Sequence, residues 1–259
     1  MKTANMLART GPAIGCISCL CLFGLHALFL ATSLQVPAGA QSGSSPASPS
    51  SNQARELNLK GIDLQSSGKL KEAVECYRRA IQINPSAAGY HNNLALALKD
   101  LDQFVAAEAE ARIALKLRPK RADYHFNLGI ILQRQKRLNE AEVAFRQAIQ
   151  IDPADTDSHF RLAQILLAEA STSNNSSDSS GTPNASTDAE QEIKLALMLK
   201  PERPEYCELL GDIYLKSKNL DEAFNQYKKV VEIKGYTAAT IPGELKAKID
   251  FIRASKPTP

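Results

Sequence analysis

The sequence contains no tryptophan, and aromatic residues make up only 6% of its 259 residues. Alanine, leucine, glutamate, lysine and arginine dominate its middle instead, and this composition favours helix. The sequence also lacks a strong excess of positive or negative charge, because it contains 31 basic and 28 acidic residues. Nucleic-acid binding requires a basic face, so this balance gives no indication of a nucleic-acid partner.

Cysteine is scarce outside the first forty residues. Three of the five cysteines lie within that segment, which leaves only Cys76 and Cys207. Two cysteines do not make a disulfide framework. They also lie on predicted helices far apart in the chain, too distant to bond. We expect both to be small buried hydrophobic residues without a chemical role.

The first forty residues differ from the rest of the chain. Two basic residues are followed by an apolar run, 13–36, without a formal charge, and then by small residues ending at Ala40. This order predicts a signal peptide, residues 1–40, with cleavage after Ala40 and an extracytoplasmic destination: periplasm, lumen or secreted. The run is also long enough to cross a bilayer, so a retained transmembrane anchor is the alternative. The small-residue site favours cleavage.

A flexible tether is predicted for residues 41–53, which are mostly Ser, Pro, Gly and Ala and offer almost nothing to bury. Beyond them the chain repeats itself. The segments IQINP, LKLRP and IQIDP end at Pro85, Pro119 and Pro153, which are separated by one constant interval. A self-similar period of about 34 residues indicates stacked helical hairpins.

Each period contains two helical patterns. Within residues 122–153 the apolar positions recur at intervals of three and four, which places each set on one helical face. They are Leu128, Ile131 and Leu132 in the first pattern and Ala141, Ala144, Phe145, Ala148 and Ile149 in the second. The polar stretch QKRLNE forms the turn between them, and Pro153 ends the second helix. Such a hairpin leaves an apolar face that neighbouring hairpins must cover.

These residues resemble the tetratricopeptide repeat family, whose pattern combines Leu-Gly, Ala, an aromatic residue, Ala and Pro at fixed spacing. The matching positions are Leu57, Gly61, Leu64, Ala73, Tyr77, Ala80 and Pro85 in the first repeat; Leu94, Ala95, Leu98, Ala107, Ala114 and Pro119 in the second; Leu128, Gly129, Ala141, Phe145, Ala148 and Pro153 in the third; and Leu210, Gly211, Tyr214, Ala223, Tyr227 and Val230 in a later one. Ala111 replaces the usual aromatic residue, and Gly235 stands where proline is expected.

The resemblance implies an all-α fold: a right-handed α-solenoid of stacked helix-turn-helix hairpins, with about five repeats and a C-terminal capping helix. The repeat domain covers residues 54–235, and residues 236–259 form the capping helix and tail. The fourth repeat is longer than the others, since the interval from Pro153 to Pro201 exceeds one period. We assign the surplus to a disordered insertion, 171–187, which loops out of the hairpin turn.

The histidines His91, His125 and His159 recur at the same interval as the prolines. Equivalent atoms of adjacent repeats lie roughly 8–10 Å apart, whereas zinc holds each ligand nitrogen at about 2.0–2.1 Å. Two of these histidines therefore cannot share one metal ion, and we predict no metal site. They are interpreted as half-buried packing residues with a hydrogen-bonded ring nitrogen.

The resemblance also implies a concave groove lined by the first helix of each repeat. Asparagine amides there can hold the backbone of an extended peptide, because they both donate and accept hydrogen bonds. Arginines can add a carboxylate contact. The candidate peptide-binding residues are Asn92, Asn93, Lys99, Phe126, Asn127, Arg134, Phe160 and Arg161. The carboxylate clamp of chaperone-binding family members is not matched, since only Asn93 fits it.

The predicted function is a non-catalytic protein–protein interaction scaffold of an extracytoplasmic compartment, which binds an extended segment of a protein or peptide partner. The first alternative is a membrane-anchored assembly factor that retains residues 13–36 as a transmembrane helix, the only case in which a membrane is involved. The second is an enzyme of unrecognised type. The sequence contains no nucleophile with a partnered base, no phosphate loop and no metal-ligand spacing. We therefore expect no catalytic residue, no cofactor and no small-molecule substrate.

Overall fold

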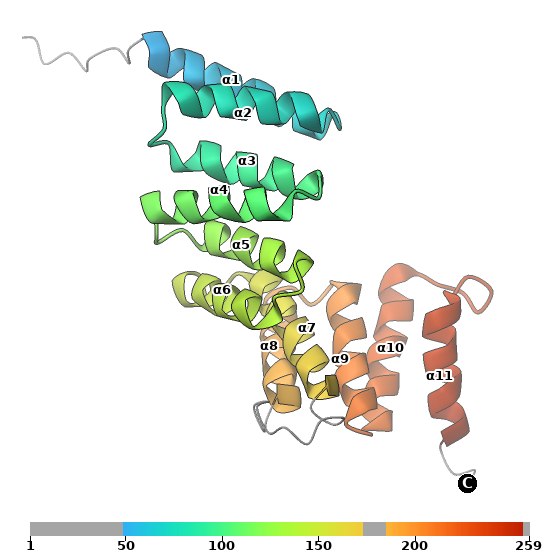
Figure 1. The fold of residues 1–259 in the computed structure, drawn as a ribbon. Coiled ribbons are helices and arrows are strands. Elements are labelled where there is room, and N and C mark those ends of the chain that lie inside the picture. The colour runs from blue at the N-terminus through green and yellow to red at the C-terminus, as the bar shows by residue number, and fades with distance from the viewer. Residues whose placement is uncertain (1–48, 173–184, 256–259) are drawn as a thin grey trace, which may run out of the picture. The chain divides into compact units, whose positions relative to one another are not determined.

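The computed structural model describes residues 49–172 and 185–255, and within these ranges it contains eleven α-helices and no strand (Figure 1). In chain order the helices are α1 (Pro49–Ser66), α2 (Leu70–Ile83), α3 (Ala88–Asp100), α4 (Phe104–Leu117), α5 (Ala122–Arg134), α6 (Leu138–Ile151), α7 (Thr156–Thr172), α8 (Ala185–Leu199), α9 (Pro204–Lys216), α10 (Leu220–Lys234) and α11 (Gly243–Ser255). The predicted all-α fold is confirmed.

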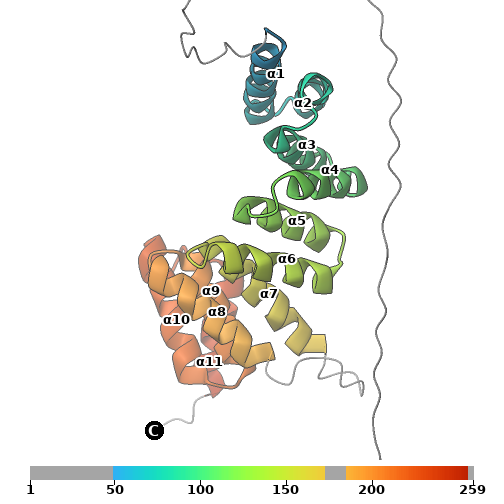
Figure 2. The same ribbon diagram turned by 90° about the vertical axis from the view of Figure 1, so that its left-hand side faces the viewer.

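The helices pair into five hairpins, each made of a first helix (α1, α3, α5, α7 or α9) and the second helix that follows it. Each helix packs most extensively against its neighbours in the chain, and α11 packs against α10 (Figures 1 and 2). Successive hairpins therefore bury one another's apolar faces. This is the predicted solenoid of about five repeats with one further C-terminal helix.

Two boundaries differ from those expected. Helix α1 begins at Pro49 instead of near residue 54, since proline is favoured at the first position of a helix. Helix α7 continues to Thr172 and α8 begins at Ala185, so both ends of the segment 171–187 are helical. Extending a helix that has already formed costs little, even for polar residues.

Several predicted segments lie outside the described residues. They are the signal peptide 1–40 with its alternative anchor 13–36, most of the tether 41–53, the middle of the insertion 171–187, and the last four residues of the tail. Among the helices that the structure describes, none combines the length and apolar content needed to cross a bilayer. Cleavage after Ala40 stays a prediction.

A glycine faces an aromatic ring inside the first, third and fifth hairpins. The pairs are Gly61–Tyr77, Gly129–Phe145 and Gly211–Tyr227. A Cβ atom added at these glycines would lie 2.5, 2.7 and 2.5 Å from a ring carbon, closer than van der Waals contact allows. In the second hairpin Ala95 occupies the glycine position, and the small side chain of Ala111 replaces the ring. Ala111 departs from the family pattern, but the alanine at position 95 compensates for it, because a small side chain there replaces the glycine that a ring would require.

The three recurring histidines each join a first helix to the turn before it. Their Nε2 atoms contact the carbonyl oxygen of the proline that ends the preceding repeat. The pairs are His91–Pro85 (3.0 Å), His125–Pro119 (2.9 Å) and His159–Pro153 (3.0 Å). Each histidine has its own carbonyl partner, so the predicted packing role with a hydrogen-bonded ring nitrogen is confirmed.

The second ring nitrogen distinguishes the three histidines. The Nδ1 atoms of His91 and His159 lie 2.7 and 2.6 Å from the carboxylates of Glu110 and Glu192. The buried Nδ1 of His125 has no hydrogen-bond partner, because Ala144 stands at the position that Glu110 occupies in the preceding repeat. At His159 the contacts with the Glu192 carboxylate and the Pro153 carbonyl oxygen favour the ring form that donates from both nitrogens.

Stability is therefore expected to depend on pH through His159. Its hydrogen bond to Glu192, partly offset by burial, raises the pKa of His159 above the ordinary 6.5. The folded state then holds this proton more tightly than the unfolded chain, so the stabilisation is complete below pH 6.5 and is lost as pH rises through the folded-state pKa. Melting temperatures measured from about pH 6 to 8 should fall more steeply for the unaltered protein than for Glu192→Gln.

The matched control is Glu232→Gln, which changes an exposed carboxylate whose ion-pair partner is Lys228. This variant should keep the pH slope of the unaltered protein. Parallel melting curves for the unaltered protein and Glu192→Gln would contradict the role assigned to the pair.

Candidate functional site

The first helices approach one another more closely than the second helices do. Helix α1 contacts α3, α3 contacts α5 and α7 contacts α9, whereas no contact of similar extent joins second helices in the described part of the chain. A stack of hairpins must curve toward the side on which its elements converge. The faces of α1, α3 and α5 that point away from the second helices therefore form an inner surface. Six of the eight candidate residues lie on α3 and α5, and the other two, Phe160 and Arg161, lie on α7.

Asparagine amides cross this inner surface from helix to helix. Asn93 Nδ2 donates to Asn58 Oδ1 and Asn127 Nδ2 donates to Asn92 Oδ1, both at 2.9 Å. Of the three asparagines predicted to bind a peptide, Asn127 is bonded to Asn92, which is itself buried, and Asn93 is bonded to Asn58 on the preceding first helix. One such bond occupies one of an amide's two donor hydrogens. Asn93 and Asn127 therefore each retain one donor hydrogen and a side-chain carbonyl oxygen.

An apolar row runs beside the amides. Ile62, Leu96 and Ile130 occupy equivalent positions of successive repeats, one each on α1, α3 and α5. Ile62 is 43% exposed, and Leu59 beside it is 49% exposed; the other two are half-buried. Sequence reasoning did not place Leu59 and Ile62 among the binding residues, because it began the groove at the second repeat. The repeat period gives the signal that identifies Ile62, which lies one period before Leu96.

The aromatic candidates are largely engaged within the fold. The Phe126 ring lies 5.7 Å from that of Phe145, and the Phe160 ring lies 5.0 Å from that of Tyr206, measured between centroids. Both phenylalanines remain half-buried. Phe126 packs within the third hairpin, and Phe160 packs between the fourth and fifth hairpins, so each leaves only part of its area for a partner.

The basic candidates lie on three different helices. Lys99 on α3 forms an ion pair with Asp100 at 3.0 Å. Arg161 on α7 donates to Gln164 at 3.2 Å and lies 5.8 Å from the Phe160 ring centroid. Arg134 at the end of α5 is exposed. The structure does not gather these charges into one anion site.

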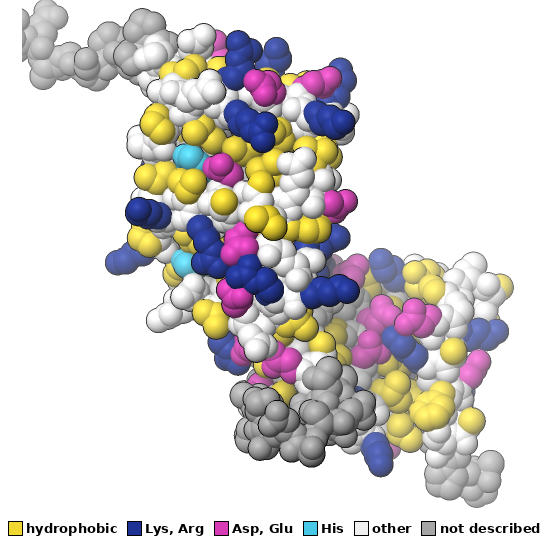
Figure 3. All heavy atoms as spheres, in the orientation of Figure 1, with side chains coloured by type: hydrophobic (Ala, Val, Ile, Leu, Met, Phe, Trp, Pro, Cys, Tyr) yellow, Lys and Arg dark blue, Asp and Glu magenta, His cyan; other side chains and the backbone are white. Residues whose placement is uncertain are grey.

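The charges of the second helices form their own pairs. Glu108 on α4 lies 2.8 Å from Arg112 and 2.5 Å from Arg137, which in turn lies 2.6 Å from Glu140 on α6. Burial raises the pKa of Glu108, but hydrogen bonds from Gln135 and these arginines lower it overall. Figure 3 shows basic and acidic side chains intermingled on this face. Paired charges of both signs do not make a surface for a polyanion.

Two kinds of reactive site, a metal centre and a reactive thiol, can be checked against the described residues. No group of three or more His, Cys, Asp or Glu side chains lies close enough there to hold a metal ion. Cys76 and Cys207 are buried and unpaired, as expected. Burial raises the pKa of the Cys207 thiol, which disfavours the reactive thiolate.

Family models for the tetratricopeptide repeat match the sequence in three places. Residues 64–102 match a model described as TPR repeat, and residues 122–155 and 204–236 match models described as Tetratricopeptide repeat. A search of curated proteins finds no match.

Solved structures share the fold at low identity. A structure from the functional characterisation of Pseudomonas aeruginosa pilF is 20% identical with a TM-score of 0.62, over 78% of this chain and 90% of that one. MamA (residues 41-end) from Desulfovibrio magneticus RS-1 is 17% identical with a TM-score of 0.61, over 71% and 96%. YrrB, described as a TPR protein with an unusual peptide-binding site, is 16% identical with a TM-score of 0.59, over 80% and 100%.

Proposed function

Because this chain is a tetratricopeptide repeat protein, we propose that it holds an extended segment of a partner protein against the inner surface of α1, α3 and α5. Its repeats and fold are those of a protein-interaction scaffold. The observation that carries the proposal is the apolar row Ile62–Leu96–Ile130, which runs beside the ladder of asparagine amides.

The spacing of the two rows suits an extended chain. Packed helices lie roughly 8–10 Å apart, and one three-residue turn of an extended polyproline II peptide spans about 9 Å and returns its side chain to the same face. One apolar side chain in every three can therefore pack on each successive residue of the row. The remaining donor and carbonyl oxygen of Asn93 and Asn127 can bond the peptide backbone whatever its side chains are. YrrB, a structure of the same fold, is described as having a peptide-binding site.

The location belongs to the proposal as well. A basic start, an apolar run and small residues ending at Ala40 favour a cleaved signal peptide and an extracytoplasmic scaffold. The alternative is an anchor at 13–36 that holds the repeats beside a membrane. The first residue of the mature protein separates the two: Gln41 at the N-terminus excludes the anchor, and Met1 or Lys2 excludes the signal.

A substitution on the inner surface tests the proposed function. Peptides selected from a displayed library against the full-length protein should bind Ile62→Asp at least tenfold more weakly, because a carboxylate desolvated against apolar side chains costs more than about 1.4 kcal/mol. Titration of a fluorescent peptide measures the loss. Asn93→Ala with Asn127→Ala is a less selective test, since these amides also link neighbouring first helices.

Val105→Asp is the matched control. This residue is 80% exposed at the start of α4, a second helix. The variant should bind the selected peptide with an affinity within twofold of the unaltered protein. Circular dichroism of both variants is expected to match that of the unaltered protein, which shows that the helices are kept. Equal affinities for Ile62→Asp and Val105→Asp would place the peptide elsewhere.

A further inference from the structure

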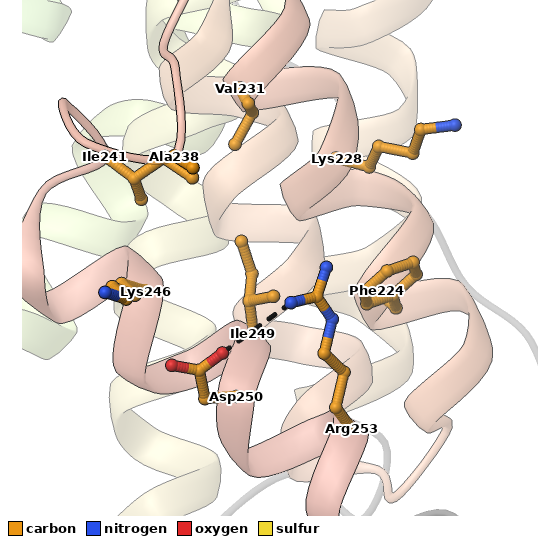
Figure 4. Close-up of a pocket in the computed structure, with 9 residues that line it drawn as sticks. All are labelled: Phe224, Lys228, Val231, Ala238, Ile241, Lys246, Ile249, Asp250 and Arg253. Carbon is orange, nitrogen blue, oxygen red and sulfur yellow. Dashed lines mark ion pairs between the residues drawn. The ribbon is translucent and has the colours of Figure 1, made fainter.

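A cavity of about 240 Å³ lies between α10, α11 and the segment that joins them (Figure 4). Its apolar lining comes from all three elements: Phe224 and Val231 from α10, Ala238 and Ile241 from the joining segment, and Ile249 from α11. None of these residues belongs to the inner surface of α1, α3 and α5. The cavity is a separate feature of the last hairpin.

The contacts that hold α11 in place lie outside the cavity. Helix α11 is seated by Leu245 and Ile252, which are 4% and 0% exposed, and by Lys248, whose Nζ lies 2.8 Å from Asp212 on α9. These contacts hold α11 without filling the space beside α10. Proline is missing at 235, where Gly235 adopts a φ of 65° and ends α10 in the left-handed region.

The joining segment fixes one wall of the cavity. The Thr237 N–H donates to Thr240 Oγ1 at 2.8 Å, and the Thr240 N–H donates to the Thr237 carbonyl at 2.9 Å. This turn holds Ala238 at the lining while its neighbour Ala239 lies outside it. A wall held by its own hydrogen bonds favours a preformed site, which loses little conformational freedom on binding.

The charges at the cavity leave an excess of one positive charge. Arg253 pairs with Asp250 at 3.8 Å, as the dashed line in Figure 4 marks. Lys228 pairs with Glu232 at 3.7 Å. Lys246, the third cation of the lining, is exposed and forms no ion pair with another described residue.

We propose that this cavity binds a small monocarboxylate with an apolar chain. The chain lies among Phe224, Val231 and Ile249, and the carboxylate lies at the rim beside Lys246. One carboxylate matches the single excess positive charge. The volume exceeds the roughly 30 Å³ of one water molecule many times, yet it lies below the about 300–1,000 Å³ typical of drug-sized ligands. A chain of about eight carbons is therefore a suitable probe.

Octanoate titrated into the full-length protein by isothermal calorimetry tests the proposal. We expect saturable binding of octanoate, weaker binding of octanol because it lacks the charge, and no binding of acetate because it lacks the chain. Ala238→Trp fills the cavity from its wall and should weaken octanoate binding at least tenfold. Ala239→Trp introduces the same side chain one residue later, outside the lining, and should leave the affinity within twofold.

Substitutions of charged residues at the rim should change the affinity in opposite directions. Lys246→Gln is expected to weaken octanoate binding about threefold, and Asp250→Asn is expected to tighten it about threefold. Changes of this size are those expected for exposed ion pairs. Lys229→Gln, on α10 outside the lining, should change nothing. The proposal is overturned by absence of saturable octanoate binding, by equal affinities for the two tryptophan variants, or by octanol binding as tightly as octanoate.

Discussion

Gly129→Ala is expected to lower the free energy of unfolding by about 2–3 kcal/mol, the cost of overpacking a filled core. The added Cβ would lie 2.7 Å from Cε1 of Phe145, whose ring is fully buried. The ring cannot withdraw without displacing its neighbours, because protein interiors are close-packed. Chemical denaturation followed by circular dichroism measures the loss.

Gly89→Ala is the matched control for this substitution. Gly89 also lies in a first helix, α3, and its added Cβ would lie 3.8 Å from the Tyr124 hydroxyl, an ordinary contact. Alanine favours helix over glycine by about 1 kcal/mol, so this variant should be slightly more stable than the unaltered protein. If Gly129→Ala is as stable as Gly89→Ala, the ring does not pack against the glycine as described.

Adding Phe145→Ala to Gly129→Ala should give a smaller loss than the sum of the two single losses. The double variant recreates the pair that the second hairpin already uses, Ala95 with Ala111. Residues in direct contact couple by about 0.5–3 kcal/mol. Strict additivity would show that the two positions act independently.

Ile252→Ala is expected to release α11 from the stack. Ile252 is fully buried, and truncating such a side chain costs about 2–5 kcal/mol. Since α11 ends the array, the loss should appear as local opening of that helix. The lower bound corresponds to roughly a thirtyfold faster exchange of the protected α11 amide hydrogens, measured by mass spectrometry or NMR.

Phe251→Ala is the control on the same helix. Phe251 precedes Ile252 directly but is 59% exposed, and exposed substitutions usually change stability by less than about 0.5 kcal/mol. Exchange of the α11 amides should stay nearly unchanged in this variant. Equal effects of the two substitutions would show that the helix is not seated through its buried face.

Periodicity predicted the fold because each hairpin obeys the same packing rule. The recurrence of Pro85, Pro119 and Pro153 placed the first three hairpins, and the interval to Pro201 placed the fourth. The later match around Gly211 and Tyr227 placed the fifth, and the family resemblance implied the final helix. Exact helix ends were less predictable, as at Pro49, because they depend on how far a formed helix extends into polar sequence.

The candidate site was predicted only in part. The sequence placed Asn93 and Asn127 on one surface, but their bonds to Asn58 and Asn92 depend on how adjacent helices align, which spacing alone does not give. The exposed Ile62 was accessible to sequence reasoning through the repeat period and was missed.

Other features could be found only in the structure. The unpartnered Nδ1 of His125 follows from the alanine that faces it from α6. The cavity beside Ile249 depends on the path of the segment that joins α10 and α11. Neither feature belongs to the repeat pattern, so the pattern does not predict them.

The position of a bound peptide tests the central claim most directly. A photo-reactive amino acid placed at Leu96 on the inner surface should cross-link the selected peptide efficiently, while the same residue placed at Val105 on α4 should give only background. Peptide captured mainly from Val105 would contradict the account, because the partner would then lie along the second helices.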